Sequence, residues 1–131
     1  DGNAKVRNTC VSILQSGYSH LRPALEDLLK NGNVKSQTAA LKVLMHYGGL
    51  DSLYNILFAL TEPHEGLQEK AWQYLASWHR QYALKLWFNF SDDTYEQTMK
   101  LLDKLIKTKI EPPYQARNAW NDLPNIMKTI K

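Results

Sequence analysis

Cysteine is almost absent from this chain. Its 131 residues include one, Cys10, which has no partner for an intramolecular disulfide and no second cysteine at the spacing of a metal-binding pair. A disulfide-stapled fold and a paired-cysteine metal site are therefore excluded. Because unpaired cysteine is typical of reducing compartments, we expect an intracellular and cytoplasmic protein.

Long hydrophobic runs are also lacking. The longest strongly apolar stretch, residues 50–60, is interrupted by Asp51, Ser52 and Asn55, and it is much shorter than a membrane-spanning helix requires. We expect no membrane insertion. No charged and then apolar leader follows Asp1, so the sequence predicts no signal peptide.

The motifs of common enzymes are missing as well. The sequence contains no G-x-S-x-G, H-E-x-x-H, P-loop or Rossmann glycine pattern, and no two of its four histidines have metal-ligand spacing. The adjacent carboxylates Glu26-Asp27 and Asp92-Asp93 flank expected turns, where charge at a helix start is the more common role. We expect no catalytic residue, cofactor or metal, although the chain could be a non-catalytic domain of a larger enzyme.

Composition predicts a folded globular domain. Apolar residues make up 44% and charged residues 22%, with 6 glycines and 5 prolines, which is far from a disordered composition. The length fits one domain over residues 1–131. The net charge of +3 comes from an excess of basic residues within residues 94–131.

A self-similar segment recurs with a period of about 30 residues. Residues 3–14 align with residues 33–44, and a third copy follows 31 residues later. In each copy a small residue precedes a leucine by four positions, which is one helical turn. These marker pairs are Cys10 and Leu14, Ala40 and Leu44, and Ala71 and Leu75.

Apolar-periodic segments of helical length separate the copies, at residues 21–29 and 50–60. Residues that stop helices lie between these segments at regular intervals. They are Asn31-Gly32-Asn33 and Glu62-Pro63-His64 inside hairpins, and Gly17 and Gly48-Gly49 between them. The sequence therefore predicts an all-α fold of helical hairpins, with Trp72 and Trp78 in the core.

The hairpin from Ala24 to Leu44 resembles a HEAT repeat, with a leucine-rich first helix, a short polar turn, and a second helix similar to V-R-x-x-A-x-x-x-L. The resemblance covers about residues 3–78. Gln37 and Gln68 replace the arginine of the family, and Asn33 stands near its usual aspartate. The resemblance implies a right-handed α-α superhelix of about three hairpins, in which the packing positions are kept and the Asp–Arg ladder lacks its arginines.

In the C-terminal half the sequence predicts further helices that follow the repeat less regularly. Arg80 begins another first helix, which passes through Leu84, Trp87 and Phe88 and stops at Phe90. Ser91 or Asp92 then caps a helix with an apolar stripe, formed by Tyr95, Met99, Leu102 and Ile106.

Glu111-Pro112-Pro113 ends that helix. Residues 114–131 are expected to form one or two short helices, interrupted at Pro124, that cap the solenoid. At the other end, the helix that begins at Asn3 has no first-helix partner. We therefore expect a fragment of a longer solenoid, with an N-terminal capping helix as the alternative.

The resemblance implies a protein-interaction scaffold whose inner surface is lined by second helices. Polar positions on these helices form the candidate surface for a protein or peptide partner. They are Asn8, Ser12, Lys35, Thr38, Lys42, Glu69 and Gln73.

A nucleic-acid-binding module is the alternative. Lys100, Lys104 and Lys107 follow one another at i, i+4 and i+7 on the side of their helix opposite its apolar stripe. Together with Lys35 and Lys42, they could neutralise backbone phosphates. Acidic residues beside these lysines, at positions 96 and 103, are more typical of a solvated helix face, and both interpretations stay open.

Overall fold

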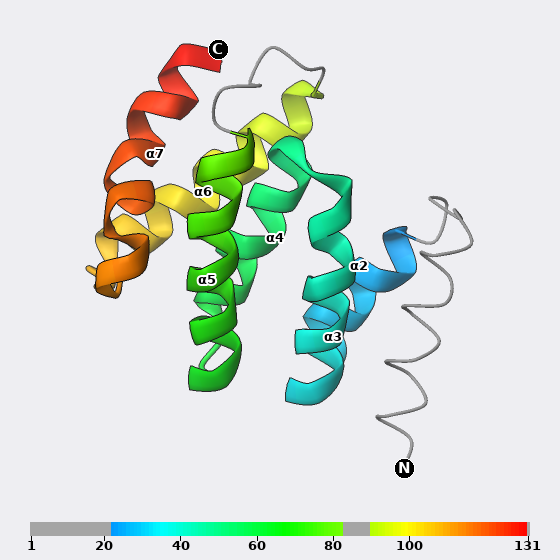
Figure 1. Cartoon of the computed structure of the whole chain (residues 1–131). Coiled ribbons are helices and arrows are strands. Elements are labelled where there is room, and N and C mark those ends of the chain that lie inside the picture. Colours follow the sequence, from blue (N-terminus) through cyan, green and yellow to red (C-terminus); the bar gives the residue numbers. More distant parts are fainter. Residues whose placement is uncertain (1–21, 83–89, 131) are drawn as a thin grey trace. The chain divides into compact units, whose positions relative to one another are not determined.

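A computed structural model describes residues 22–82 and 90–130, and all regular structure in these two ranges is helical (Figure 1). It consists of six α-helices and two short 3-10 helices, with no strand in the described ranges. The predicted all-α class is confirmed. The chain divides into two compact units, Asp1–His46 and Tyr47–Lys131.

None of the helices in the described part of the chain is both long enough and apolar enough to cross a lipid bilayer.

In the first unit, α2 (Arg22–Asn31) packs on α3 (Val34–Leu44). The turn between them requires glycine, because a Cβ on Gly32 would lie 2.6 Å from the backbone oxygen of Leu28. The next residue, Asn33, is the N-cap of α3, and its side chain accepts a hydrogen bond of 2.9 Å from the backbone N–H of Ser36. Such caps typically contribute about 1 kcal/mol. The predicted hairpin break is confirmed.

The second unit contains a hairpin of α4 (Gly49–Thr61) and α5 (Glu65–Tyr82). A 3-10 helix, η2 (Met45–Tyr47), precedes α4. The linking residues Gly48 and Gly49 have φ angles of 67° and 62°, a region that is open to glycine and strained for most other residues. The predicted break at these two glycines is confirmed.

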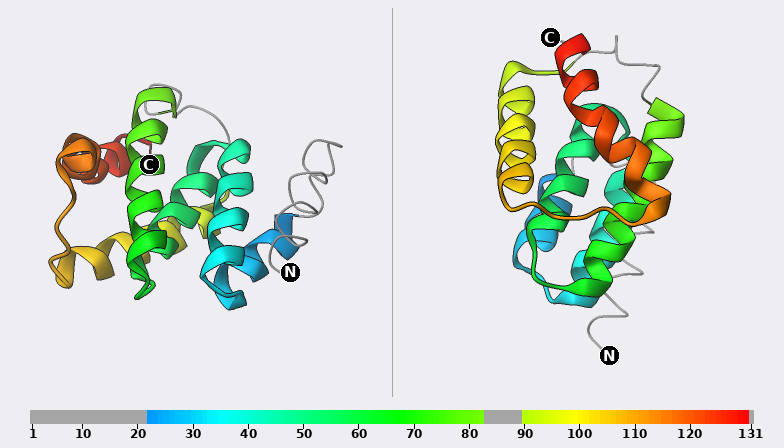
Figure 2. Two further views of the ribbon diagram at one scale, coloured as in Figure 1. Left: turned by 60° about the horizontal axis from the view of Figure 1, so that its bottom comes forward. Right: turned by 90° about the vertical axis from the view of Figure 1, so that its left-hand side faces the viewer.

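Three further elements complete the second unit. Helix α6 (Asp92–Lys107) packs on α4, whereas η4 (Tyr114–Ala116) and α7 (Arg117–Ile130) pack on α5 (Figure 2). Of the two predicted N-caps, Ser91 and Asp92, the structure has Ser91, whose side chain accepts a hydrogen bond from the Thr94 N–H. The phenol of Tyr95 donates a 2.9 Å hydrogen bond to the backbone oxygen of Met127 and thereby joins α6 to α7.

The recurring marker positions are core positions. Ala40 and Leu44 in α3, and Ala71 and Leu75 in α5, are completely buried. The predicted burial of both tryptophans is also confirmed: Trp72 is 9% exposed, and Trp78 is fully buried. The Trp78 indole N–H donates a 2.8 Å hydrogen bond to the backbone oxygen of Gly49, so the polar atom of this large side chain is satisfied.

Gln37 and Gln68 make similar contacts. Gln37 Nε2 donates to the backbone oxygen of Leu29 at 2.8 Å, and Gln68 Nε2 donates to that of Glu62 at 2.6 Å. Both bonds run from the second helix of a hairpin to the end region of its first helix. Each satisfies a carbonyl for which a helix end provides no intrahelical donor.

The prediction that a new helix begins at Arg80 is wrong. Helix α5 runs without a break from Glu65 to Tyr82. No glycine or proline follows Gly66 in this helix, and nothing therefore stops it at residue 79 or 80. The other positions assigned to the expected helix, Leu84, Trp87 and Phe88, lie outside the described residues.

The buried face of α6 also differs from the predicted stripe. Its buried residues are Thr98, Leu102 and Leu105, at i, i+4 and i+7, whereas Ile106 is 47% exposed. Tyr95 and Met99 lie at the margin and are half-buried. Both stripes have helical spacing, and the packing of α6 on α4 selects the one that contains Leu105.

Pro124 does not interrupt the C-terminal helix, so that prediction is wrong too. Helix α7 continues through the proline from Arg117 to Ile130. Its buried residues lie on both sides of Pro124 and are Ala119, Leu123, Ile126 and Met127. Burying a large apolar side chain contributes about 1.5–3 kcal/mol, so the three largest together outweigh the roughly 3 kcal/mol cost of an internal proline.

Candidate binding surface on helix α5

The predicted surface residues of the first unit lie on α3. Lys35 and Lys42 are exposed, and Thr38 is partly exposed, with its hydroxyl donating to the backbone oxygen of Val34 within the same helix. Asn8 and Ser12 lie outside the described residues.

The predicted surface residues of the second unit lie on α5. Glu69 and Gln73 are one helical turn apart, and both are exposed. They lie on the side of the helix away from the fully buried Leu67, Leu75 and Trp78. This part of the candidate surface is accessible to a partner.

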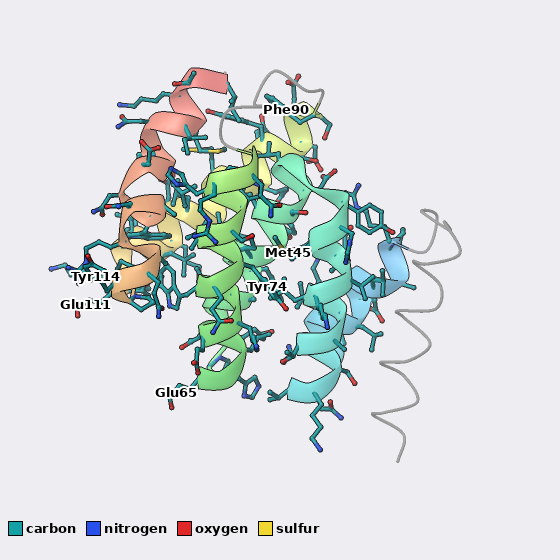
Figure 3. All side chains as sticks on the ribbon, in the orientation of Figure 1. Met45, Glu65, Tyr74, Phe90, Glu111 and Tyr114 are labelled. Carbon is teal, nitrogen blue, oxygen red and sulfur yellow. The ribbon has the colours of Figure 1, made fainter. Side chains whose placement is uncertain are left out.

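A hollow of about 450 Å³ adjoins Glu69. One side is formed by α5, and the other by the segment between α6 and α7. The lining residues are Glu65, Gln68, Glu69, Trp72, Glu111, Pro112, Pro113 and Gln115. Figure 3 labels Glu65 and Glu111, which come from these two segments. The hollow opens to solvent and is large enough for side chains of another molecule.

Helical spacing explains the contribution of α5. Glu65, Gln68, Glu69 and Trp72 follow one another at i, i+3, i+4 and i+7, so they share one face of the helix. Gln73 borders the same face. The hollow is therefore continuous with the predicted interaction surface on this helix.

Trp72 is the large apolar residue of the lining, and its position is fixed by α7. Its ring contacts that of Trp120 edge to face, with centroids 5.5 Å apart and planes at 85°. Edge-to-face pairs are a favoured aromatic geometry. Because Trp72 is only 9% exposed, it presents a firm apolar surface to the hollow and is not free to reorient.

The opposite side of the hollow is also constrained. Pro112 and Pro113 have restricted backbone torsions, and η4 begins directly after them. The Ala116 N–H donates a 3.0 Å hydrogen bond to the backbone oxygen of Pro113, and Ala116 is fully buried where η4 packs on α5. The hollow is thus bounded by two segments that the fold holds in place.

The charge of the hollow is negative. Among the described residues that line it, Glu65, Glu69 and Glu111 are acidic and none is a lysine or arginine. The nearby Arg117 lies over the ring of Tyr114, 6.0 Å from its centroid, and belongs to neither side of the hollow. The arrangement favours cations over anions.

Three of the five lysines predicted as the alternative site lie on α6, and the other two, Lys35 and Lys42, lie on α3. Lys100, Lys104 and Lys107 are all exposed and lie opposite the buried face of that helix. Glu96 and Asp103 are also exposed on the solvent side. The lysine ridge, as we call these three lysines, is therefore accessible but has mixed charge.

Two other groups bear on chemistry. His79 Nε2 lies 2.9 Å from a carboxylate oxygen of Asp122 and links α5 to α7. Within residues 22–82 and 90–130, no three histidine, cysteine or acidic side chains are placed to hold a metal ion.

No protein-family model, curated protein or solved structure matches this chain.

Only the α5 side of this site was predicted from the sequence, and only in part. Glu69 and Gln73 were predicted as surface residues, whereas Trp72 was predicted only as core and Glu111-Pro112-Pro113 only as a helix break. Glu65 and Glu111 are far apart in the sequence, and no local spacing indicates that they line one hollow. The contact of η4 with α5 brings them together.

Proposed function

We propose that this protein is a binding scaffold of the HEAT-like type, a right-handed superhelix of helical hairpins. The second helices of its hairpins, α3 and α5, would present the inner surface to another protein or to a peptide. Binding would rely on surface complementarity without catalytic turnover.

The two described hairpins support the repeat architecture. The marker residues of α3 and α5 are buried at matching positions. Gln37 and Gln68, 31 residues apart, both donate to carbonyls near the end of the preceding helix. The two carbonyls lie at different offsets, eight and six residues before the glutamine, so the support comes from the matching role of the two glutamines at the end of the preceding helix.

The observation that carries the binding function is the hollow beside Glu69. It combines a firm apolar surface at Trp72 with exposed polar side chains on two constrained segments. Sites that bind other molecules typically pair apolar area with a few fixed polar groups. Helix α5 thus provides exposed side chains that a partner can reach and one side of a hollow that a partner can fill.

A selection from random peptides displayed on phage tests this proposal. The wild-type protein is the bait, and the selected peptides are then bound to two charge-matched variants, Glu69→Arg and Asp103→Arg. We expect binders that lose affinity at least tenfold with Glu69→Arg and keep it with Asp103→Arg, because Asp103 is exposed on α6, away from the hollow. Absence of enriched binders, or binders insensitive to Glu69→Arg, would contradict the proposal.

Nucleic-acid binding is the second candidate, supported by the exposure of the lysine ridge on α6. It ranks second because Glu96 and Asp103 reduce the positive charge of the same solvent-facing side. Phosphate binding depends on the local density of positive charge. The two acidic residues lower that density below what the three lysines would provide by themselves.

A further inference from the structure

The charge and apolar surface of the hollow on α5 indicate which chemical group it receives. Its volume of about 450 Å³ is in the range of sites for small molecules and individual side chains. Part of a flexible chain can enter it, whereas a folded domain cannot.

Charge excludes the anionic occupants. Glu65 and Glu69 come from α5, and Glu111 comes from the segment that precedes η4. Carboxylates thus face the hollow from both sides, and no described lining residue offers a compensating cation. A phosphate or an acidic side chain would meet repulsion there, and a cation would meet attraction.

The apolar part of the lining selects among cations. Trp72, Pro112 and Pro113 contribute ring surface between the carboxylates. Lysine and arginine bury their methylene groups along apolar surface while the charged end reaches polar groups, and both interact favourably with aromatic rings. An inorganic cation has no methylene groups to bury against these rings.

Backbone chemistry favours recognition of side chains over recognition of main chain. Pro112 and Pro113 have no backbone N–H, so these residues cannot donate main-chain hydrogen bonds to a partner strand. The Gln68 side chain uses its Nε2 to bond Glu62 O, which leaves its Oε1 as the atom that can accept a hydrogen bond from an ammonium or guanidinium group.

Building on the proposed scaffold function, we propose that the hollow formed by α5 and Glu111-Pro112-Pro113 receives a lysine or arginine side chain from an extended basic segment of a partner protein. Glu65, Glu69 and Glu111 would attract the charged end, and Trp72 with the two prolines would contact its methylene groups.

Titration of the isotope-labelled, full 131-residue chain with defined peptides, followed by NMR, tests this inference. One peptide repeats Gly-Ser-Arg, and its control repeats Gly-Ser-citrulline, which keeps the shape of arginine and removes its charge. We expect the arginine peptide to shift the Trp72 indole and Gln115 side-chain signals saturably, and more weakly as salt is raised. Equal binding of the citrulline peptide would overturn the inference.

Two variants with the same charge change provide the matched control. Glu69→Arg should weaken binding of the arginine peptide at least tenfold, and Asp103→Arg should change it less than twofold. Circular dichroism shows whether each variant is folded, and Glu69→Gln serves as a milder second variant that should still weaken binding measurably. Unchanged binding in both Glu69 variants would overturn the inference.

The outcomes also separate this inference from the proposed function. If displayed peptides bind the α5 surface without enrichment of lysine or arginine, the scaffold function stands and the cation preference fails. If no displayed peptide binds and the arginine peptide produces no saturable shift, both fail.

Discussion

Trp72 and Trp120 meet edge to face, with ring centroids 5.5 Å apart and an interplanar angle of 85°. The pair joins α5, which forms one side of the hollow, to α7. It also explains why an aromatic residue on an otherwise polar helix face is held in one orientation. The hollow is thus a property of the tertiary fold and not of α5 alone.

Removing one ring of this pair should destabilise the second unit. We expect Trp120→Ala to lower the free energy of unfolding by about 2 kcal/mol, because edge-to-face pairing adds roughly 0.5–1.5 kcal/mol to the loss of buried area. Urea denaturation followed by circular dichroism measures the change. A variant as stable as wild type would show that the ring contact contributes nothing.

The glutamine contacts of the two hairpins predict a second effect. Gln37→Leu keeps the size of the side chain but leaves the buried Leu29 carbonyl without this donor, and it should cost about 1–3 kcal/mol. Gln68→Leu should cost less, because its hydrogen bond is only partly buried. Thermal and urea denaturation measure the loss of stability in both variants. A larger loss for Gln68→Leu than for Gln37→Leu would contradict this prediction.

Pro124 offers a stabilising substitution. Pro124→Ala restores a backbone N–H opposite the carbonyl of Trp120, four residues earlier in α7, and it removes the steric cost of an internal proline. We expect the free energy of unfolding to rise by about 1–3 kcal/mol. A loss of stability on this substitution would mean that α7 depends on the shape that its proline imposes.

Tyr74 predicts how stability changes at high pH. Burial raises the pKa of its phenol above the ordinary value of 10.0, so the folded chain holds the proton to higher pH than the unfolded chain does. This contribution is fully present below pH 10 and is lost as the pH rises through the folded-state value. Tyr74→Phe should therefore make the fall in stability above pH 10, measured by urea denaturation, shallower, and an equally steep fall in this variant would contradict the prediction.

The lysine ridge yields a prediction about nucleic acid. Because Glu96 and Asp103 accompany its three lysines, we expect duplex DNA and single-stranded RNA to bind weakly at low salt and not at physiological ionic strength. Fluorescence anisotropy of labelled oligonucleotides measures this. A steep linear loss of affinity with the logarithm of salt, abolished by Lys100→Glu and Lys104→Glu, would instead support the nucleic-acid candidate.

Local chemistry made much of the fold predictable. The breaks at Gly32-Asn33 and Gly48-Gly49 and the cap at Ser91 depend on neighbouring residues only, and all three are found in the structure. The buried markers in α3 and α5 also follow from spacing within one helix.

What the sequence did not reveal depends on contacts between distant segments. Leu105 and Ile106 both continue a helical stripe, and only the packing on α4 decides which is buried. Proline disfavours a helix interior, and the sequence therefore predicted an interruption at Pro124. In the structure the burial of residues on both sides of Pro124 outweighs this cost. The approach of Glu111 to α5 also depends on a contact between distant segments and could not be predicted. The exposure of Glu69 follows from its place on one helix and was predicted.

The central claim is that a partner contacts the exposed face of α5 beside the hollow. Photo-crosslinking tests it most directly: a benzophenone amino acid replaces Gln73 in one variant and Lys104 on α6 in another, and each is irradiated with a peptide selected on the wild-type protein. Mass spectrometry then identifies the adducts. Our account predicts crosslinks from position 73 and none from position 104; crosslinks from position 104 alone would contradict it.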